Sequence, residues 1–150
     1  MGELVGELLA IARKGQSRAP MEEVDSVQVT QEAGLEGDHC GRRPKNRQVT
    51  VISADVWAEV CAELGAEIAW TLRRANLLVR GVDLPRREGA RLTIGALELQ
   101  IGMETAPCDR MDEQHPGLTA ALKPDWRGGV ACRVLNDAEI RIGDAVAAEG

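Results

Sequence analysis

The sequence predicts a β-rich domain of about seven or eight short strands and two or three short helices, arranged as a closed or partly open β-barrel. Short apolar runs with a period of two, separated by Gly and Pro turn signals, recur along most of the chain. Closing such a sheet into a barrel also removes its exposed edges. With 150 residues, 44% of them hydrophobic, we expect one domain over residues 1–150 with its own core.

The first half of the chain carries four strand signals. Residues 4–12 are compatible with a helix or a strand, and we favour a strand over their second half. Val24, Val27 and Val29 form a β-branched run that predicts one strand. Two further strands are expected over residues 48–52 and 77–79. Glycines on either side of Leu35 indicate backbone conformations that residues with a Cβ resist.

One helix is predicted directly after the strand at residues 48–52. Ser53 is a good N-cap, and Asp55 in the first turn complements the helix dipole. Gly65 is the expected end of the helix. The apolar face of this helix contains Trp57, Val60, Cys61 and Leu64. We therefore expect Cys61 to be a buried core residue. Residues 68–74 predict only a short helical turn.

The second half predicts a hairpin followed by three more strands. Residues 92–94 and 97–101 alternate apolar and polar side chains across a Gly95-Ala96 turn, which is typical of a β-hairpin. Pro107 cannot donate a ladder hydrogen bond and is expected to end the second strand. A short helix is expected over residues 118–122, and the final strands over 130–135, 140–142 and 145–146. In the first of these, Cys132 shares the buried face with Val130 and Val134.

Composition argues against several classes of function. The net charge is −6, and the chain has three Trp but neither Phe nor Tyr, so nucleic acid is not an expected partner. No apolar run approaches the length of a membrane helix, and the N-terminus lacks the basic region of a signal peptide. The four cysteines form no C-x-x-C pair, which argues against a structural zinc site. We expect a cytoplasmic protein with free thiols.

Cys108 is the main candidate for chemistry. It follows the predicted end of a strand, where a rigid scaffold meets a loop, and Arg110 lies close by. A thiolate near guanidinium groups has a depressed pKa and is the reactive form of cysteine. The alternative is that Cys108 is a small buried hydrophobic residue.

A second candidate is the basic stretch over residues 42–47. Arg42, Arg43, Lys45 and Arg47 bring four positive charges together in an acidic chain. They favour an anion site, because guanidinium groups match phosphate oxygens, although a solvated loop explains them equally well. If the stretch forms an anion site, we expect it near the mouth of a pocket that contains Cys108.

An ordered set of short motifs extends over nearly the whole chain. In chain order these are Gly34-Leu35-Glu36-Gly37-Asp38-His39, Arg47-Gln48-Val49-Thr50, Arg74-Ala75-Asn76-Leu77, Gly81, Leu84, Gly89, Gly95, Pro107-Cys108, Arg127-Gly128-Gly129 and Ile142-Gly143-Asp144. Each motif alone is weak, but the set resembles a MOSC domain of the small stand-alone bacterial type. This domain is also found at the C-terminus of molybdenum-cofactor sulfurases.

The resemblance implies a barrel related to the pyruvate-kinase barrel domain, with a pocket for the molybdenum cofactor, molybdopterin. In the mitochondrial amidoxime-reducing component, which contains this domain, the cysteine that matches Cys108 ligates molybdenum. The Arg and Asn of its Arg-Pro-Asn motif match Arg74 and Asn76, with Ala75 replacing the proline. A guanidinium group for the cofactor phosphate would come from Arg74, Arg47 or Arg127. Asn76 has donor and acceptor groups for a pterin edge.

Three functions remain open on this basis. The first is a molybdenum-dependent reductase of N-hydroxylated small molecules, with Cys108 as metal ligand, His39, Asp109 or His115 as proton donor, and a redox protein as partner. For His115, a surface role is favoured over catalysis. The second is a sulfur carrier that forms a persulfide on Cys108 and passes it to a partner protein. The third is a module that binds an anionic small molecule. Pyridoxal phosphate enters only at the family level, because the sulfurases hold it in a separate domain.

Overall fold

Strands form most of the regular structure, as the alternating pattern predicts. The computed structural model of the protein describes residues 6–15, 21–38, 47–73, 75–105, 112 and 115–148. The strands in these ranges are β1 (Gly6–Arg13), β2 (Glu22–Val24), β3 (Ser26–Thr30), β4 (Gly34–Leu35), β5 (Val49–Ser53), β6 (Leu77–Arg80), β7 (Arg91–Ile94), β8 (Leu97–Glu104), β9 (Val130–Val134), β10 (Ala138–Arg141) and β11 (Ala145–Ala148). The helices are α1 (Ala54–Leu64) and α3 (Leu118–Leu122), with 3-10 turns η3 (Trp70–Arg73) and η4 (Pro124–Trp126).

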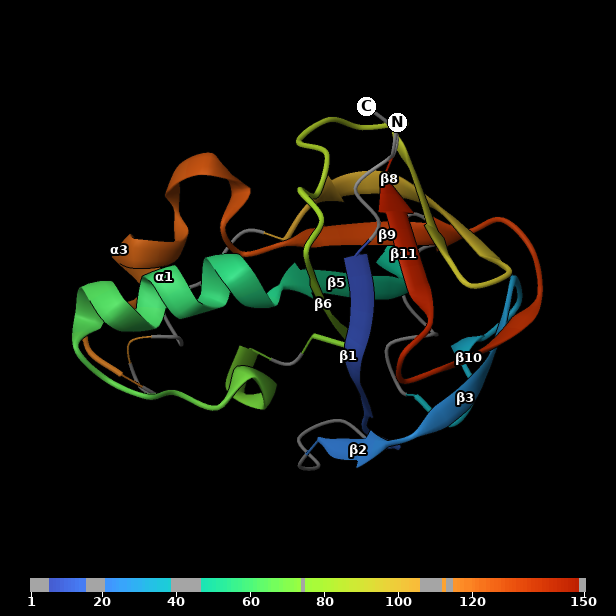
Figure 1. Ribbon diagram of the computed structural model, residues 1–150, viewed down its shortest axis with the longest axis horizontal. Helices are drawn as coiled ribbons and strands as arrows, with labels where there is room; N and C mark the ends of the chain where they lie inside the picture. The colour runs from blue at the N-terminus through green and yellow to red at the C-terminus, as the bar shows by residue number, and fades with distance from the viewer. Residues whose placement is uncertain are drawn as a thin grey trace.

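Seven strands close into a barrel in the order β11-β7-β8-β9-β5-β6-β1, and β1 pairs back onto β11 (Figure 1). Neighbouring strands are antiparallel except β5 and β6, which are parallel with Val51 opposite Leu77. A parallel pair requires a crossover, and α1 lies within the one between β5 and β6. The predicted fold class, a β-rich barrel with two or three short helices, is confirmed.

A second sheet corrects the prediction of one strand through Val24, Val27 and Val29. The chain forms two strands there, β2 in the barrel sheet and β3 in a separate sheet of order β10-β3-β4. The break falls at Asp25, whose carbonyl accepts a hydrogen bond from the backbone of Ile142. This break and the short β4 each add a strand that the sequence analysis did not identify, and the described ranges hold eleven strands, more than the seven or eight expected. The second sheet nevertheless shares one hydrophobic core with the barrel.

Helices α1 and α3 pack against each other beside the barrel (Figure 1). Helix α1 begins as predicted, with Ser53 Oγ accepting from the Val56 backbone, and it ends at Gly65. Only part of its apolar face is covered: Trp57 and Val60 are buried, but Cys61 is half-buried. The expectation that Cys61 is a buried core residue is therefore wrong, because Cys61 packs against the cluster that Trp57 and Val60 form with α3 but stays partly exposed. No helix in the described ranges is long and apolar enough to cross a membrane.

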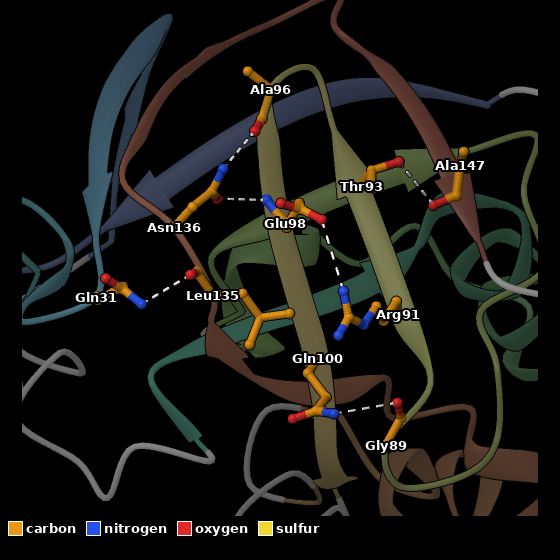
Figure 2. Close-up of polar contacts among 10 residues, drawn as sticks. All are labelled: Gln31, Gly89, Arg91, Thr93, Ala96, Glu98, Gln100, Leu135, Asn136 and Ala147. Atoms are coloured by element: carbon orange, nitrogen blue, oxygen red, sulfur yellow. Dashed lines mark hydrogen bonds and ion pairs between the residues drawn. The ribbon is translucent and has the colours of Figure 1, made fainter.

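The hairpin of β7 and β8 turns at Gly95-Ala96, as predicted, and carries a polar outer face (Figure 2). Arg91 and Glu98 form an ion pair 3.9 Å long on this face. Asn136 binds the hairpin from the side, because its amide accepts from the Glu98 backbone and donates to Ala96. Strand β8 continues to Glu104, beyond the predicted residue 101. We call the outer surface of β7 and β8 that carries Arg91 and Glu98 the hairpin face.

The strand pattern of β9 is confirmed, since Val130, Cys132 and Val134 all belong to the barrel core. The alternation fails in the predicted strand at residues 140–142. Ile140 is buried, but β10 ends at Arg141 and Ile142 is 43% exposed.

Candidate functional site

The six predicted site residues fall into two groups. Cys108, His39 and Arg74 lie outside the described residues, as do Arg42, Arg43 and Lys45 of the basic stretch. Arg47, Asn76 and Arg127 are described, and each has a different environment. Arg47 is exposed, Asn76 is fully buried, and Arg127 lies in an ion pair.

Asn76 is the centre of a buried set of polar contacts, which we call the Asn76 network. Its Oδ1 accepts from the backbone N–H of Thr50 at 3.0 Å and from the Thr50 hydroxyl at 3.1 Å. Its Nδ2 donates to the Ala12 carbonyl at 3.2 Å and to Asp38 Oδ2 at 3.1 Å. Its backbone N–H donates to Thr50 as well. The side-chain amide thus joins β1, β5 and the segment before His39.

Asp38 completes the Asn76 network from the side of the Gly34–His39 motif. Its Oδ1 accepts the backbone N–H of Lys14 at 3.0 Å, while Oδ2 accepts from Asn76. The carboxylate is 8% exposed, and hydrogen bonds of this kind offset the cost of burying its charge. Arg13 secures the same segment by donating to the Glu36 carbonyl at 2.7 Å. The residue that precedes His39 is therefore held at the barrel wall.

Arg127 is held by Glu63 of α1. The guanidinium makes two hydrogen bonds to the carboxylate, at 2.9 and 2.6 Å, and a third to the Ala121 carbonyl at 3.1 Å. Hydrogen bonding and charge attraction lower the pKa of Glu63 and raise the pKa of Arg127, which is therefore cationic. These contacts tie the Arg127-Gly128-Gly129 motif to both helices and use three of the five N–H groups of Arg127.

The backbone that leads into this motif is strained. Asp125 and Trp126 are consecutive non-glycine residues with φ of 55° and 54°. Such conformations cost roughly 1–2 kcal/mol each for residues with a Cβ. Backbone hydrogen bonds from Arg127 to Pro124 and from Gly129 to Trp126 hold the turn. A recess of about 20 Å³, room for about one water, lies between this turn, Ser53 and Arg86.

A backbone hydrogen bond connects the turn to the segment that carries Cys108. Thr105 follows β8, and its N–H donates to the Gly129 carbonyl at 2.9 Å. Three residues span at most roughly 11 Å, so chain connectivity alone keeps Cys108 within that reach of Thr105. The structure therefore brings Thr105, three residues before Cys108 in the sequence, to the Arg127-Gly128-Gly129 motif.

Arg47 and Arg127 are not brought together. In the β5–β9 pair, Val51 lies opposite Val130 and Val49 opposite Cys132. Gly129 is therefore level with Ile52, near the end of β5 that leads into α1, whereas Arg47 precedes the opposite end of the strand, which begins at Val49. The expectation that the basic stretch lies beside Cys108 stays a prediction, since Cys108 and the basic residues before Arg47 lie outside the described residues.

Asp38, Thr50 and Glu63 are site residues that the sequence analysis did not identify. Thr50 offered a signal, because it is a polar residue inside the apolar run Val49 to Ile52 and is only 4% exposed. Asp38 belongs to the motif over residues 34–39, but that motif alone indicated no role for its side chain. Glu63 gave no signal, since it is one of several acidic residues on the exposed side of α1.

The described residues fit a cofactor of the expected kind only in part. Arg47 and Arg127 offer guanidinium groups, which suit a phosphate. Asn76 does not fit a role at a pterin edge, because both hydrogens and both lone pairs of its amide are used within the protein.

Comparison with known proteins identifies the family and similar folds. The protein-family model of the MOSC domain matches residues 35–147. Among solved structures, the YuaD protein from Bacillus subtilis is similar, with a TM-score of 0.78 and 18% identity over 95% of this chain and 94% of that one. YiiM from Geobacillus stearothermophilus matches with a TM-score of 0.74 and 15% identity over 97% of this chain and 75% of that one. No curated protein sequence matches.

Proposed function

Because this chain belongs to the MOSC domain family, we propose that it binds the molybdenum cofactor through Cys108 and reduces N-hydroxylated small molecules. The observation that supports this is the hydrogen bond between Thr105, three residues before Cys108 in the sequence, and Gly129 of the Arg127 motif. The MOSC family is associated with molybdenum-cofactor binding, and Cys108 lies within the matched range. A soft thiolate suits a high-valent molybdenum centre better than a carboxylate does.

The arginines and His39 also have roles in this proposal. Arg74, Arg47 or Arg127 supplies positive charge for the cofactor phosphate, and Arg127 would do so while held by Glu63. Positive charge near Cys108 would also favour its thiolate form. His39 donates protons, because its ordinary pKa lies nearest neutral pH. A reducing cytoplasm would keep the thiol of Cys108 available for the metal.

The proposed reaction is balanced with two electrons and two protons. The N–O bond of the substrate breaks, the nitrogen gains one hydrogen, and the oxygen leaves as water. The bound cofactor would supply the two-electron chemistry, and a small redox protein would deliver the electrons. The chain itself holds the cofactor, orients it and donates protons.

A sulfur carrier is the second function, and a nucleophilic Cys108 would support it equally. The Cys108 thiolate attacks the outer sulfur of a persulfide on a donor protein. A new S–S bond forms on Cys108, and the donor leaves as a thiolate, with no net oxidation. This function requires an exposed thiolate and a docking surface for the donor.

Metal and sulfur analysis distinguishes the two functions. The protein is produced in a host that makes the cofactor, purified without reductant, and assayed for molybdenum and for sulfane sulfur. Stoichiometric molybdenum supports the reductase. A mass increase of one sulfur on Cys108 without metal supports the carrier, and the absence of both signals contradicts both functions.

Two substitutions sharpen this assay. Cys108→Ser replaces a soft ligand with a poorly ionised hydroxyl, so molybdenum or sulfane sulfur should be lost while the melting temperature changes little. Arg74→Ala should lower cofactor affinity roughly ten- to a hundredfold, the effect of one charge-assisted hydrogen bond. Cys61→Ser is the matched control, because Cys61 is a half-buried thiol on α1. Loss of stability with unchanged loading in Cys108→Ser would show an ordinary core cysteine.

A further inference from the structure

The Asn76 amide has a single orientation and no hydrogen-bonding position left for a ligand. Two of its neighbours, the Ala12 carbonyl and the Asp38 carboxylate, only accept hydrogen bonds, so the Nδ2 group must face them. The backbone N–H of Thr50 only donates, so Oδ1 must face Thr50. Asn76 is also fully buried, with no side-chain surface at the solvent. Any influence of this residue on a bound ligand must therefore pass through its neighbours.

The neighbour that leads out of the Asn76 network is Asp38. Its carboxylate is fixed at both oxygens, by Lys14 and by Asn76, and its backbone N–H donates to Leu35. On the other side of the segment, a Cβ at Gly37 would lie 3.2 Å from the Arg13 guanidinium, so the packing there is close. Displacing the Asp38 side chain would therefore displace the main chain at Asp38, the residue directly before His39 in the sequence.

From this arrangement we infer that Asn76 and Asp38 are positioning residues, which fix the turn over residues 36–38 directly before His39 in the sequence and do not touch the ligand themselves. The inference deepens the proposed function and depends on it for the identity of the ligand. It replaces direct contact between Asn76 and a pterin edge with an indirect role. The hydrogen bond from Asn76 Nδ2 to Asp38 Oδ2 carries that role.

NMR of the full-length protein tests the positioning without any cofactor. The chain contains two histidines, His39 and His115, so the Cε1–H signal of one reports on the site and the other serves as reference. Asn76→Asp places a second carboxylate against Asp38 and the Ala12 carbonyl. We expect the His39 signal to move and the His115 signal to stay. Adding Asp38→Asn supplies an N–H group across the pair again, so the double variant should return the His39 signal toward its original position.

Two further variants keep the test decisive. Thr50→Val serves if Asn76→Asp fails to fold. It removes one of the hydrogen bonds that Asn76 Oδ1 accepts and leaves Asp38 in place, so we expect a smaller shift of the His39 signal. Asn136→Ala is the matched control, because the Asn136 amide also makes two hydrogen bonds to backbone but does so on the hairpin face (Figure 2). An unmoved His39 signal in a folded network variant, or an equal shift in Asn136→Ala, would overturn the inference.

Cofactor loading separates positioning from direct contact. Molybdenum content should fall roughly tenfold in Asn76→Asp, the effect of one hydrogen bond to a charged group, and recover in the double variant. If Asn76 contacted the cofactor directly, the double variant would restore the His39 signal but not the molybdenum, and the inference would be wrong. Absence of molybdenum from the unsubstituted protein would instead count against the proposed function, while the NMR comparison would still hold.

Discussion

Asn76 and Asn136 show how one residue type acts in two regions of this barrel. Both use their side-chain amides to hold backbone. Asn136 lies half-buried beside the hairpin face, and its side chain binds Ala96 in the turn and Glu98 in β8, two residues apart in the sequence (Figure 2). Asn76 is fully buried, and its partners come from three different segments. The comparison suggests that polar groups with distant, buried partners set the shape of the site, whereas the hairpin face is local and replaceable.

The largest expected effect tests this comparison directly. Asn76→Ala removes the amide that binds Asp38 Oδ2, the Ala12 carbonyl and the Thr50 N–H, and should lower the free energy of unfolding by about 4 kcal/mol. Asn136→Ala exposes its former partners to water and should cost about 1 kcal/mol. Urea unfolding measures both losses of unfolding free energy, provided that the m-values of the two variants are equal. Equal losses would show that burial does not distinguish the two amides.

Gly129 and Gly143 extend the comparison to the backbone, with the second largest effect. Both have a φ near 95°, which favours glycine. A Cβ at Gly129 would clash with the Val51 carbonyl and the Ile52 side chain, whereas a Cβ at Gly143 would meet nothing within 4 Å. Gly129→Ala should therefore cost about 3 kcal/mol, and Gly143→Ala only the conformational cost of about 1 kcal/mol. Similar melting temperatures for the two variants would contradict the close approach at Gly129.

The sequence predicted the local features of the fold and missed the distant ones. The β7–β8 hairpin, the Ser53 cap and the β9 pattern depend on neighbours a few residues apart, which periodicity and turn residues reveal. Periodicity could not show that the chain changes sheets at Asp25, because a β-branched run looks the same in either sheet. Nor could it show that Cys61, on the apolar face of α1, is only partly buried where it packs against the α1–α3 cluster.

The site shows the same limit more strongly. Asn76 was identified from a motif, but its role depends on partners 26, 38 and 64 residues away in the sequence. Arg127 was assigned to an anion, and its partner Glu63 lies 64 residues away. Such pairings follow from how strands β1, β5 and β6 meet in space. No single-sequence pattern encodes that arrangement.

Cys132 and Cys61 give a third, smaller contrast. Cys132 is fully buried in the barrel core, and burial raises the pKa of its thiol to about 12. At pH 8 only about one Cys132 in ten thousand would be thiolate, so iodoacetamide should not label it in the native protein. Half-buried Cys61 should be labelled slowly. Cys132→Ser should lower the free energy of unfolding by about 2 kcal/mol, because it buries a hydroxyl among the apolar side chains of the barrel core. Cys61→Ser should lower it clearly less. Rapid labelling of Cys132 would mean that the barrel opens readily.

The smallest effect concerns two ion pairs. Glu63 and Arg127 approach to 2.6 Å with the Arg127 side chain 19% exposed, whereas Arg91 and Glu98 on the hairpin face are 3.9 Å apart with the Arg91 side chain 59% exposed. The hydrogen bond from Arg127 lowers the pKa of Glu63 below its ordinary 4.5. A carboxyl group whose pKa is lower in the folded protein stabilises the fold at any pH above its ordinary pKa. That stabilisation is lost as the pH falls from the ordinary pKa through the pKa of the folded protein.

Unfolding measured as a function of pH tests this last contrast. The free energies of unfolding of the unsubstituted protein and Glu63→Gln should differ most above pH 4.5 and converge at lower pH. The difference should be small and should shrink with added salt, since Glu63 is exposed. Glu98→Gln is the matched control, and its long, exposed ion pair should make the smaller contribution. A Glu63→Gln profile parallel to that of the unsubstituted protein down to acid pH would show that Glu63 does not fix Arg127 in solution.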